Sequence, residues 1–187
     1  MDIKNKDVLQ RLKDGNARYL AAQTAAGDVS PALRARTAAE GQNPYAIVIT
    51  CADSRVIPES IFSAGLGELF VIRVAGNVLD NHQLGSIEYA AAHLNTKLIV
   101  MLGHTGCGAI HAAMEGGGDG FIKFITDEVL AAIGGERDDY RACVKNVEHG
   151  VAVIREEFRH HPEIPSAHLD ILGAVYHIDS GEVDWLV

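Results

Sequence analysis

The chain has 187 residues, of which 48% are hydrophobic and 22% are charged, and its formal net charge is −9. This length suffices for one sizeable core but is short for two, so we expect a single domain over residues 1–187. The acidic balance argues against a nucleic-acid partner, which would require clustered Lys and Arg. No run approaches the roughly 18 uninterrupted apolar residues of a membrane span, and the first residues lack the apolar segment of a secretory signal. We therefore expect a cytoplasmic protein with no membrane partner.

Two helices are predicted ahead of the first strand. Residues 5–22 carry apolar side chains at helical spacing among Lys, Arg and Gln, which predicts an amphipathic helix with one apolar stripe. Ser30 and Pro31 form a helix cap followed by proline at the first helical position, so a second helix is expected to run to about Glu40. Residues 1–40 are thus predicted to form a helical arm.

From residue 44 onward, predicted strands alternate with predicted helices. Four runs are rich in β-branched and apolar residues, as parallel strands covered on both faces are. These runs are 45–50, 69–74, 97–102 and 169–178. Helices are predicted at 82–94, 121–133 and 138–160, a glycine-rich loop at 116–120, and a turn at Ser180-Gly181. The alternation predicts an α/β fold, with residues 44–187 forming a mostly parallel central β-sheet flanked by helices.

Two of the predicted strands end next to residues that can bind a metal. Strand 45–50 leads directly into Cys51, and strand 97–102 leads into His104 and Cys107. Open α/β sheets place ligands beyond the carboxyl ends of their strands, so neighbouring strands would bring both loops together. Two thiolates and one imidazole suit a tetrahedral zinc ion with an open fourth position, which is typical of catalytic sites. A water bound there can lose a proton near neutral pH and supply a hydroxide nucleophile.

The spacing Cys-x-Asp-x-Arg places Asp53 and Arg55 beside the predicted metal, where they can form a charge-assisted pair. Held by Arg55, Asp53 can accept a hydrogen bond from the hydroxide and orient it. A released Asp53 could instead become a fourth ligand and close the site. Gly106 and Gly108 let the backbone run close to the metal, and the Gly108 amide could donate to a substrate oxygen.

The segments Cys51-Ala-Asp-Ser-Arg55 and His104-Thr-Gly-Cys107-Gly108 resemble the paired motifs of the β-carbonic anhydrases, strongly over about residues 40–115 and loosely elsewhere. The resemblance implies reversible hydration of carbon dioxide to bicarbonate and a proton (carbonate dehydratase activity), with zinc-bound hydroxide as the attacking group. The residues that match the family pattern are Cys51, His104 and Cys107 as ligands of one Zn²⁺ per chain, Asp53 and Arg55 as the catalytic dyad, and Gln42, Phe70, Tyr89 and Gly108 as the substrate pocket.

The family resemblance also carries expectations about partners. In the β-carbonic anhydrases the pocket lies at a dimer interface, and the N-terminal helices embrace the partner subunit. Residues 1–40 would then be a dimerisation arm, and the chain would form a homodimer or a dimer-based higher homo-oligomer. The small-molecule partner would be carbon dioxide or bicarbonate.

Val48 marks a departure from part of the family. Some members have a tryptophan three residues before the first cysteine ligand, where it helps to form a noncatalytic bicarbonate site that favours the closed zinc site. Arg73 and Tyr176 match other parts of that site, but Val48 has no N–H donor. We therefore predict the open form, with Asp53 held by Arg55, at neutral pH.

Two alternative functions remain open at this point. Related scaffolds hydrolyse carbon disulfide or carbonyl sulfide when access to the pocket narrows. A site closed permanently by Asp53 would instead make the chain a noncatalytic zinc-binding regulatory module. Cys143, within a predicted helix, is assigned no role because cysteine is often buried as a small hydrophobe. A structural role is also favoured for His111, although it lies on the same helix face as Cys107.

Overall fold

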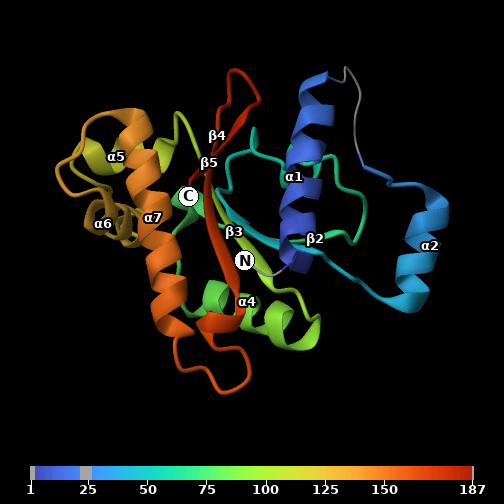
Figure 1. The fold of residues 1–187 in the computed structure, drawn as a ribbon. Helices are drawn as coiled ribbons and strands as arrows, with labels where there is room; N and C mark the ends of the chain where they lie inside the picture. The colour runs from blue at the N-terminus through green and yellow to red at the C-terminus, as the bar shows by residue number, and fades with distance from the viewer. Residues whose placement is uncertain (1–2, 22–26, 187) are drawn as a thin grey trace.

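The computed structural model of the chain describes residues 3–21 and 27–186, so the predicted end of the first helix at residue 22 lies outside the described residues. One five-stranded sheet crosses the molecule, with helices on both faces (Figure 1). Its strands are β1 (Ala46–Thr50), β2 (Leu69–Arg73), β3 (Leu98–His104), β4 (Asp170–Tyr176) and β5 (Val183–Leu186). They lie in the order β2-β1-β3-β4-β5, and only the β4–β5 pairing is antiparallel. The predicted α/β class with a mostly parallel sheet is confirmed.

The central strands β1 and β3 are buried along their whole length. Successive side chains of a strand point to opposite faces of the sheet, and both faces of these strands are apolar. Ile47 and Ile49 therefore belong to the core on one face, and Val48 belongs to the core on the other. Continuous apolar runs in the sequence correspond to this two-sided burial.

Four helices cover one face of the sheet (Figure 1). They are α4 (Asn81–His93), α5 (Gly108–Met114), α6 (Ile122–Ile133) and α7 (Asp139–Glu157). Side-chain caps fix where two of them begin. Asp80 accepts from the His82 amide in a capping box that Gln83 completes, and Asp138 accepts from the Arg141 amide at 2.9 Å. The predicted helices at 82–94, 121–133 and 138–160 are confirmed to within a few residues at their ends.

The other face of the sheet is covered by α1 (Ile3–Ala21) and the short α3 (Pro58–Ile61). Leu12 of α1 is fully buried against this face. The Asn16 side chain ties α1 to the turn between β4 and β5 by donating to the Gly181 carbonyl at 2.9 Å. By contrast, α2 (Pro31–Glu40) lies to the side of the sheet in Figure 1, and Leu33 is its one buried residue.

Short elements connect the main ones. A 3₁₀ turn, η1 (Ala75–Asn77), follows β2, and a second, η2 (Ser166–His168), precedes β4. The sequence pattern did not predict either turn. A hairpin joins β4 to β5, where the Gly181 amide donates to the His177 carbonyl at 2.8 Å. Gly181 has a φ of +81°, which suits glycine, and the predicted turn at Ser180-Gly181 is confirmed.

Within the described part of the chain, no helix combines the length and the apolar character needed to cross a bilayer.

The strand order places β1 between β2 and β3, so the chain leaves β1 on one side and returns on the other. In open α/β sheets, ligands bind in the crevice beyond the carboxyl ends of the strands at such a reversal. Cys51 follows the last residue of β1, and His104 is the last residue of β3. The topology therefore brings the two predicted metal-binding segments to the same edge of the sheet.

The close approach of α7 to the sheet depends on two glycines. A Cβ atom at Gly103 would lie 2.6 Å from the Val147 Cγ2, and one at Gly173 would lie 2.8 Å from the Val147 Cγ1. We expect Gly103→Ala to lower the free energy of unfolding by about 1–3 kcal/mol, because a methyl group has no room there. Urea unfolding measures this loss. The double variant, with Gly103→Ala and Val147→Ala together, is expected to lose less free energy of unfolding than the sum of the two single losses.

The control for this substitution is Gly85→Ala on α4. A Cβ at this exposed helical position would meet nothing within 4 Å. It is therefore expected to leave stability unchanged or raise it by up to about 1 kcal/mol, as alanine does in helices. Equal stability of Gly103→Ala and the wild type would contradict the proposed close packing.

Candidate metal centre

Cys51, His104 and Cys107 converge at the carboxyl ends of β1 and β3. Their ligand atoms, one from each residue, all lie within 4.8 Å of one another. The three residues are between 1% and 5% exposed, so the group is buried. Cys107 directly precedes α5 at its N-cap position, where its carbonyl accepts from the His111 amide at 3.0 Å and its side chain makes no capping bond. The structure thus brings together all three predicted metal ligands.

The donor set fits a zinc ion. The Nδ1 atom of His104 lies 3.0 Å from the Thr105 carbonyl oxygen, which orients the ring. Its Nε2 atom is buried without a hydrogen-bond partner, and it is the one such buried side-chain nitrogen or oxygen among residues 3–21 and 27–186. Buried polar atoms are rarely left unpaired. A cation held between this nitrogen and two sulfurs accounts for the unpaired atom, and zinc prefers this combination of ligands.

The Cys51 sulfur is prepared to carry negative charge. The pKa of Cys51 lies well below its ordinary value, because the Cys107 thiol and backbone amides stabilise its thiolate and outweigh the opposing effect of burial. The amides of Asp53 and Gly76 donate to this sulfur at 3.4 and 3.3 Å. The pKa of Cys107 lies above its ordinary value for two reasons. The Cys107 thiol donates a hydrogen bond to the Cys51 sulfur, and its side chain is buried. Cys51 is therefore the more readily ionised of the two thiols.

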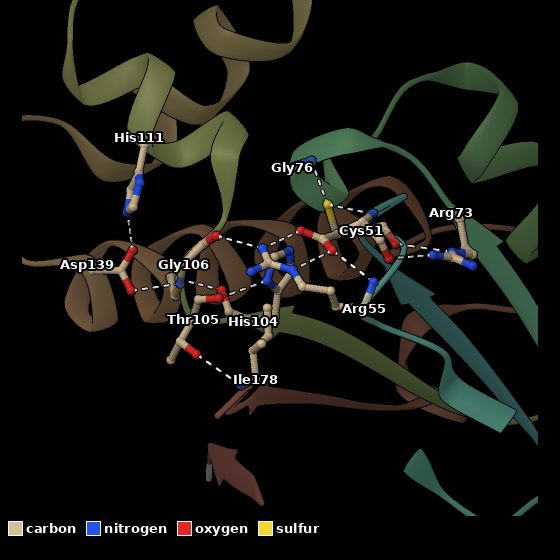
Figure 2. A network of polar contacts seen from close by, with 12 residues as sticks. Cys51, Arg55, Arg73, Gly76, His104, Thr105, Gly106, His111, Asp139 and Ile178 are labelled. Atoms are coloured by element: carbon tan, nitrogen blue, oxygen red, sulfur yellow. Dashed lines mark hydrogen bonds and ion pairs between the residues drawn. The ribbon is translucent and has the colours of Figure 1, made fainter. Parts of the chain in front are cut away.

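Asp53 and Arg55 form the predicted pair in a two-pronged geometry. The Nε and Nη2 atoms of Arg55 donate to the two carboxylate oxygens of Asp53 at 3.0 and 2.7 Å. The Arg55 amide also donates to Asp53 Oδ1 at 2.9 Å. The same guanidinium reaches the Gly106 carbonyl at 3.3 Å, across the site (Figure 2). Arg55 therefore joins the loop that carries Cys51 to the loop between His104 and Cys107.

Arg73 holds the backbone of the first loop. Its Nε and Nη2 atoms donate to the carbonyls of Cys51 and Asp53 at 3.2 and 2.7 Å (Figure 2). The resemblance places Arg73 in a noncatalytic bicarbonate site together with Tyr176. In this chain the Tyr176 hydroxyl lies 3.1 Å from the Tyr19 hydroxyl of α1, and Val48 is fully buried.

The four predicted substrate residues are placed differently. Gly108 is exposed and adjacent to Cys107, at the metal group. Phe70 and Tyr89 pack against each other with ring centroids 6.2 Å apart. Gln42 is exposed and precedes β1, whereas the metal group follows β1, so the two lie at opposite ends of this strand. A single chain therefore brings Gly108, but not Gln42, to the metal group.

Sequence reasoning missed several residues that contact the metal-binding segments. The Gly76 amide donates to the Cys51 sulfur, and the Cys143 sulfur, to which no role was assigned, donates to the His104 carbonyl at 2.8 Å. Asp139 accepts from the Gly106 amide at 2.9 Å and lies 2.8 Å from the Nε2 atom of His111 (Figure 2). Nothing in the sequence except helical periodicity pointed to these contacts, because the partners lie far apart along the chain.

Comparisons with known proteins agree with this geometry. The family model described as carbonic anhydrase matches residues 46–183. Carbonic anhydrase 2 of Mycobacterium tuberculosis is 39% identical over 181 residues, which cover 91% of this chain and 87% of the relative. The carbonic anhydrase of Pseudomonas aeruginosa is 34% identical over 176 residues, covering 81% and 77% of the two chains.

Solved structures show the same fold. A tetrameric β-carbonic anhydrase of Sordaria macrospora is similar with a TM-score of 0.71 at 25% identity, covering 97% of this chain and 96% of its own. A Coccomyxa β-carbonic anhydrase in complex with acetazolamide gives a TM-score of 0.65 at 29% identity, covering 85% and 86%. The chain therefore belongs to the carbonic anhydrase family, as a zinc enzyme of the β class that hydrates carbon dioxide reversibly to bicarbonate and a proton.

Proposed function

We propose that Cys51, His104 and Cys107 hold the catalytic zinc ion of this carbonic anhydrase, one ion per chain. The observation that carries the proposal is the convergence of two thiols and one unpaired imidazole nitrogen from separate strand ends within 4.8 Å. When bound, zinc supplies Lewis acidity that brings the pKa of a coordinated water toward neutrality. Orientation of the attacking group and binding of the substrate are then proposed to depend on residues of the protein.

Asp53 is proposed to orient the attacking group and to stay off the metal. Both of its oxygens accept hydrogen bonds from Arg55, and Oδ1 accepts two of them, but Oδ2 accepts only one and keeps a lone pair for a further donor. Rotation of Asp53 toward the sulfurs would break its hydrogen bonds to Arg55, and Arg55 is itself anchored at the Gly106 carbonyl. This geometry supports the open form and disfavours the reading of a permanently closed regulatory module.

The charge state of Asp53 follows from the same contacts. The hydrogen bond from Arg55 holds the pKa of Asp53 well below its ordinary value, against a smaller opposing effect of burial. Because the pKa of Asp53 is lower in the folded chain, the pair contributes fully to stability at any pH above the ordinary pKa of Asp. This contribution is lost as the pH falls through the lowered pKa of the folded chain. Asp53 is therefore an acceptor, never a proton donor, at any pH near neutrality.

The Gly108 amide is proposed to receive a substrate oxygen. Gly108 is exposed and follows Cys107 directly, and a Cβ at this position would meet nothing within 4 Å. Open space beside the ligand thus remains for a small molecule of the size of carbon dioxide or bicarbonate. A backbone N–H can donate there as oxygen gains negative charge during hydration.

A second copy of the chain is proposed to complete the pocket. Gln42, Phe70 and Tyr89 match pocket positions of the family, but Gln42 lies at the far end of β1 from the metal group of its own chain. Tyr89 is 48% exposed, which leaves its ring free to contact another subunit. We infer that residues 1–187 form a single domain whose residues 1–40 act as a dimerisation arm, in a homodimer or an oligomer built from it.

The cellular location is proposed to be the cytoplasm. Cys51, Cys107 and Cys143 are all free and buried. Free thiols without disulfides suit a reducing compartment, where the metal-binding sulfurs stay available.

Activity and metal content test the ligand and dyad assignments together. Stopped-flow hydration of carbon dioxide is expected to be fastest on the alkaline side, because two thiolates cancel the charge of the metal and weaken its effect on water. Cys51→Ala is expected to lose the zinc. Arg55→Ala is expected to keep zinc but to lose at least about 10-fold in activity, the usual minimum for an outer-shell partner.

Two controls make this test decisive. His82→Ala removes a 94% exposed imidazole side chain on α4 and is expected to keep both zinc and activity. Carbon disulfide and carbonyl sulfide are assayed beside carbon dioxide, and preferential turnover of either would favour the sulfur-substrate alternative. Full activity of Arg55→Ala would refute the role given to the pair.

The ionisation of Asp53 can be measured directly. In a carbon-13 NMR titration, the side-chain carboxyl of Asp53 is expected to titrate below the ordinary Asp value of about 3.9, because Arg55 stabilises its charged form. In Arg55→Ala the midpoint is expected to move up. A midpoint of Asp53 at or above that ordinary value of about 3.9 would contradict the pairing.

The dimer proposal predicts concentration-dependent association of the intact chain. Sedimentation velocity is expected to give a dimer or a multiple of it, and Gln42→Ala is expected to raise the KM for carbon dioxide while leaving the zinc content unchanged. A fully active monomer would overturn this proposal, since Gln42 of the same chain does not lie at the metal group.

A further inference from the structure

Three polar side chains of helix α7 form hydrogen bonds with the backbone of segments that carry or contact the proposed metal ligands. Asp139, Cys143 and Asn146 are spaced four and three residues apart, so they lie on one face of the helix. Asn146 is 5% exposed and Cys143 is 1% exposed. None of the three belongs to the proposed ligand set, to the dyad or to the substrate pocket. Each nevertheless bonds to the backbone of a segment that positions a ligand.

Asn146 acts on the first cysteine through a glycine. Its Nδ2 atom donates to the Gly76 carbonyl at 2.9 Å, and the Gly76 amide donates to the Cys51 sulfur at 3.3 Å. Gly76 has a φ of +68°, and a Cβ there would lie 3.1–3.3 Å from side-chain atoms of α5 and α6. The glycine is therefore confined between those helices, with its carbonyl anchored by Asn146 and its amide by the Cys51 sulfur.

Cys143 and Asp139 act in the same way on the second loop. The Cys143 sulfur donates to the His104 carbonyl at 2.8 Å. Asp139 accepts from the Gly106 amide at 2.9 Å (Figure 2). Asp139 is itself held by His111, whose Nε2 atom lies 2.8 Å away. These two contacts hold the two consecutive peptide groups on either side of Thr105, within the turn between His104 and Cys107.

The polar contacts are separate from those that anchor the helix. Apolar residues of α7, including Val147, Val151 and Ile154, pack into the core between the helices and the sheet. This burial provides most of the stabilisation that holds α7 in place, as apolar burial does generally. Loss of one polar contact can therefore alter the metal centre without detaching the helix.

We propose that Asn146, Cys143 and Asp139 are positioning residues of the metal centre, through which α7 sets the relative placement of the three ligands. The three ligands come from two loops that covalent geometry leaves independent, so one rigid element bonded to both loops restricts their separation. Partners of ligands in the outer shell of metal sites typically contribute 10–100-fold to metal affinity or activity. This inference rests on the ligand set proposed above.

Zinc affinity is the main test, measured by competition with a chromophoric chelator at equilibrium. Asn146→Ala is expected to raise the Kd for zinc by about 10–100-fold. Its matched control is Val151→Ala, which removes a buried apolar side chain from the same helix. The control is expected to unfold more easily but to keep the wild-type Kd. The cobalt-substituted proteins are compared by absorption, where the sulfur-to-cobalt band is expected to shift in Asn146→Ala and not in the control.

A conservative pair at Cys143 gives an independent readout. Cys143→Ser keeps a hydrogen-bond donor beside the His104 carbonyl, and Cys143→Ala removes it. We expect the serine variant to retain a Kd within about threefold of wild type and the alanine variant to lose at least about 10-fold. Because both replacements are small, this pair decides the question even if Asn146→Ala does not fold.

Two different failures are distinguishable. If wild type binds one zinc and Cys51→Ala loses it, but Asn146→Ala and Cys143→Ala match Val151→Ala in Kd and cobalt spectrum, the positioning role of α7 is wrong and the ligand set stands. If Cys51→Ala keeps its zinc, the ligand assignment is wrong, and the inference about α7 is lost with it.

Discussion

The register between β1 and β3 is the constraint on which the metal centre depends. Thr50 lies opposite Leu102 in this parallel pair, and its buried hydroxyl donates to the Leu102 carbonyl at 2.8 Å. A shift of one residue would turn every side chain of the strand to the other face of the sheet. Cys51 would then point away from His104. A pair of strands whose residues are about fifty positions apart in sequence thus determines whether the chain can bind a metal at all.

The two faces of the sheet contribute differently to this arrangement. On one face, α7 supplies both apolar packing and polar contacts to the metal-binding loops. On the other face, α1 contributes a buried Leu12 and a bond from Asn16 to the Gly181 carbonyl, far in sequence from either loop. The face that carries α7 therefore combines apolar packing with hydrogen bonds to the segments around the proposed metal site.

Much of the fold and the ligand set could be predicted from the sequence, because both leave local signals. A continuous apolar run in the sequence indicates β1. Cys51, His104 and Cys107 lie at or just after the ends of predicted strands, and this combination of residue types is typical of a metal site. The supporting contacts leave no such signal. Asn146 resembles any helical asparagine until folding places it against Gly76, seventy residues earlier in the chain. The position of Gln42 relative to the metal likewise depends on an assembly that one chain does not contain.

Burial of Cys51, His104 and Cys107 also restricts which reagents can reach the two sulfurs. Cys51, His104 and Cys107 are each at most 5% exposed, and the Asp53–Arg55 pair spans the two loops beside them. The sulfurs are therefore shielded from bulky reagents, whereas the space beside Gly108 is open to a small molecule. The packing that positions these side chains thus also selects, by size, what can approach them.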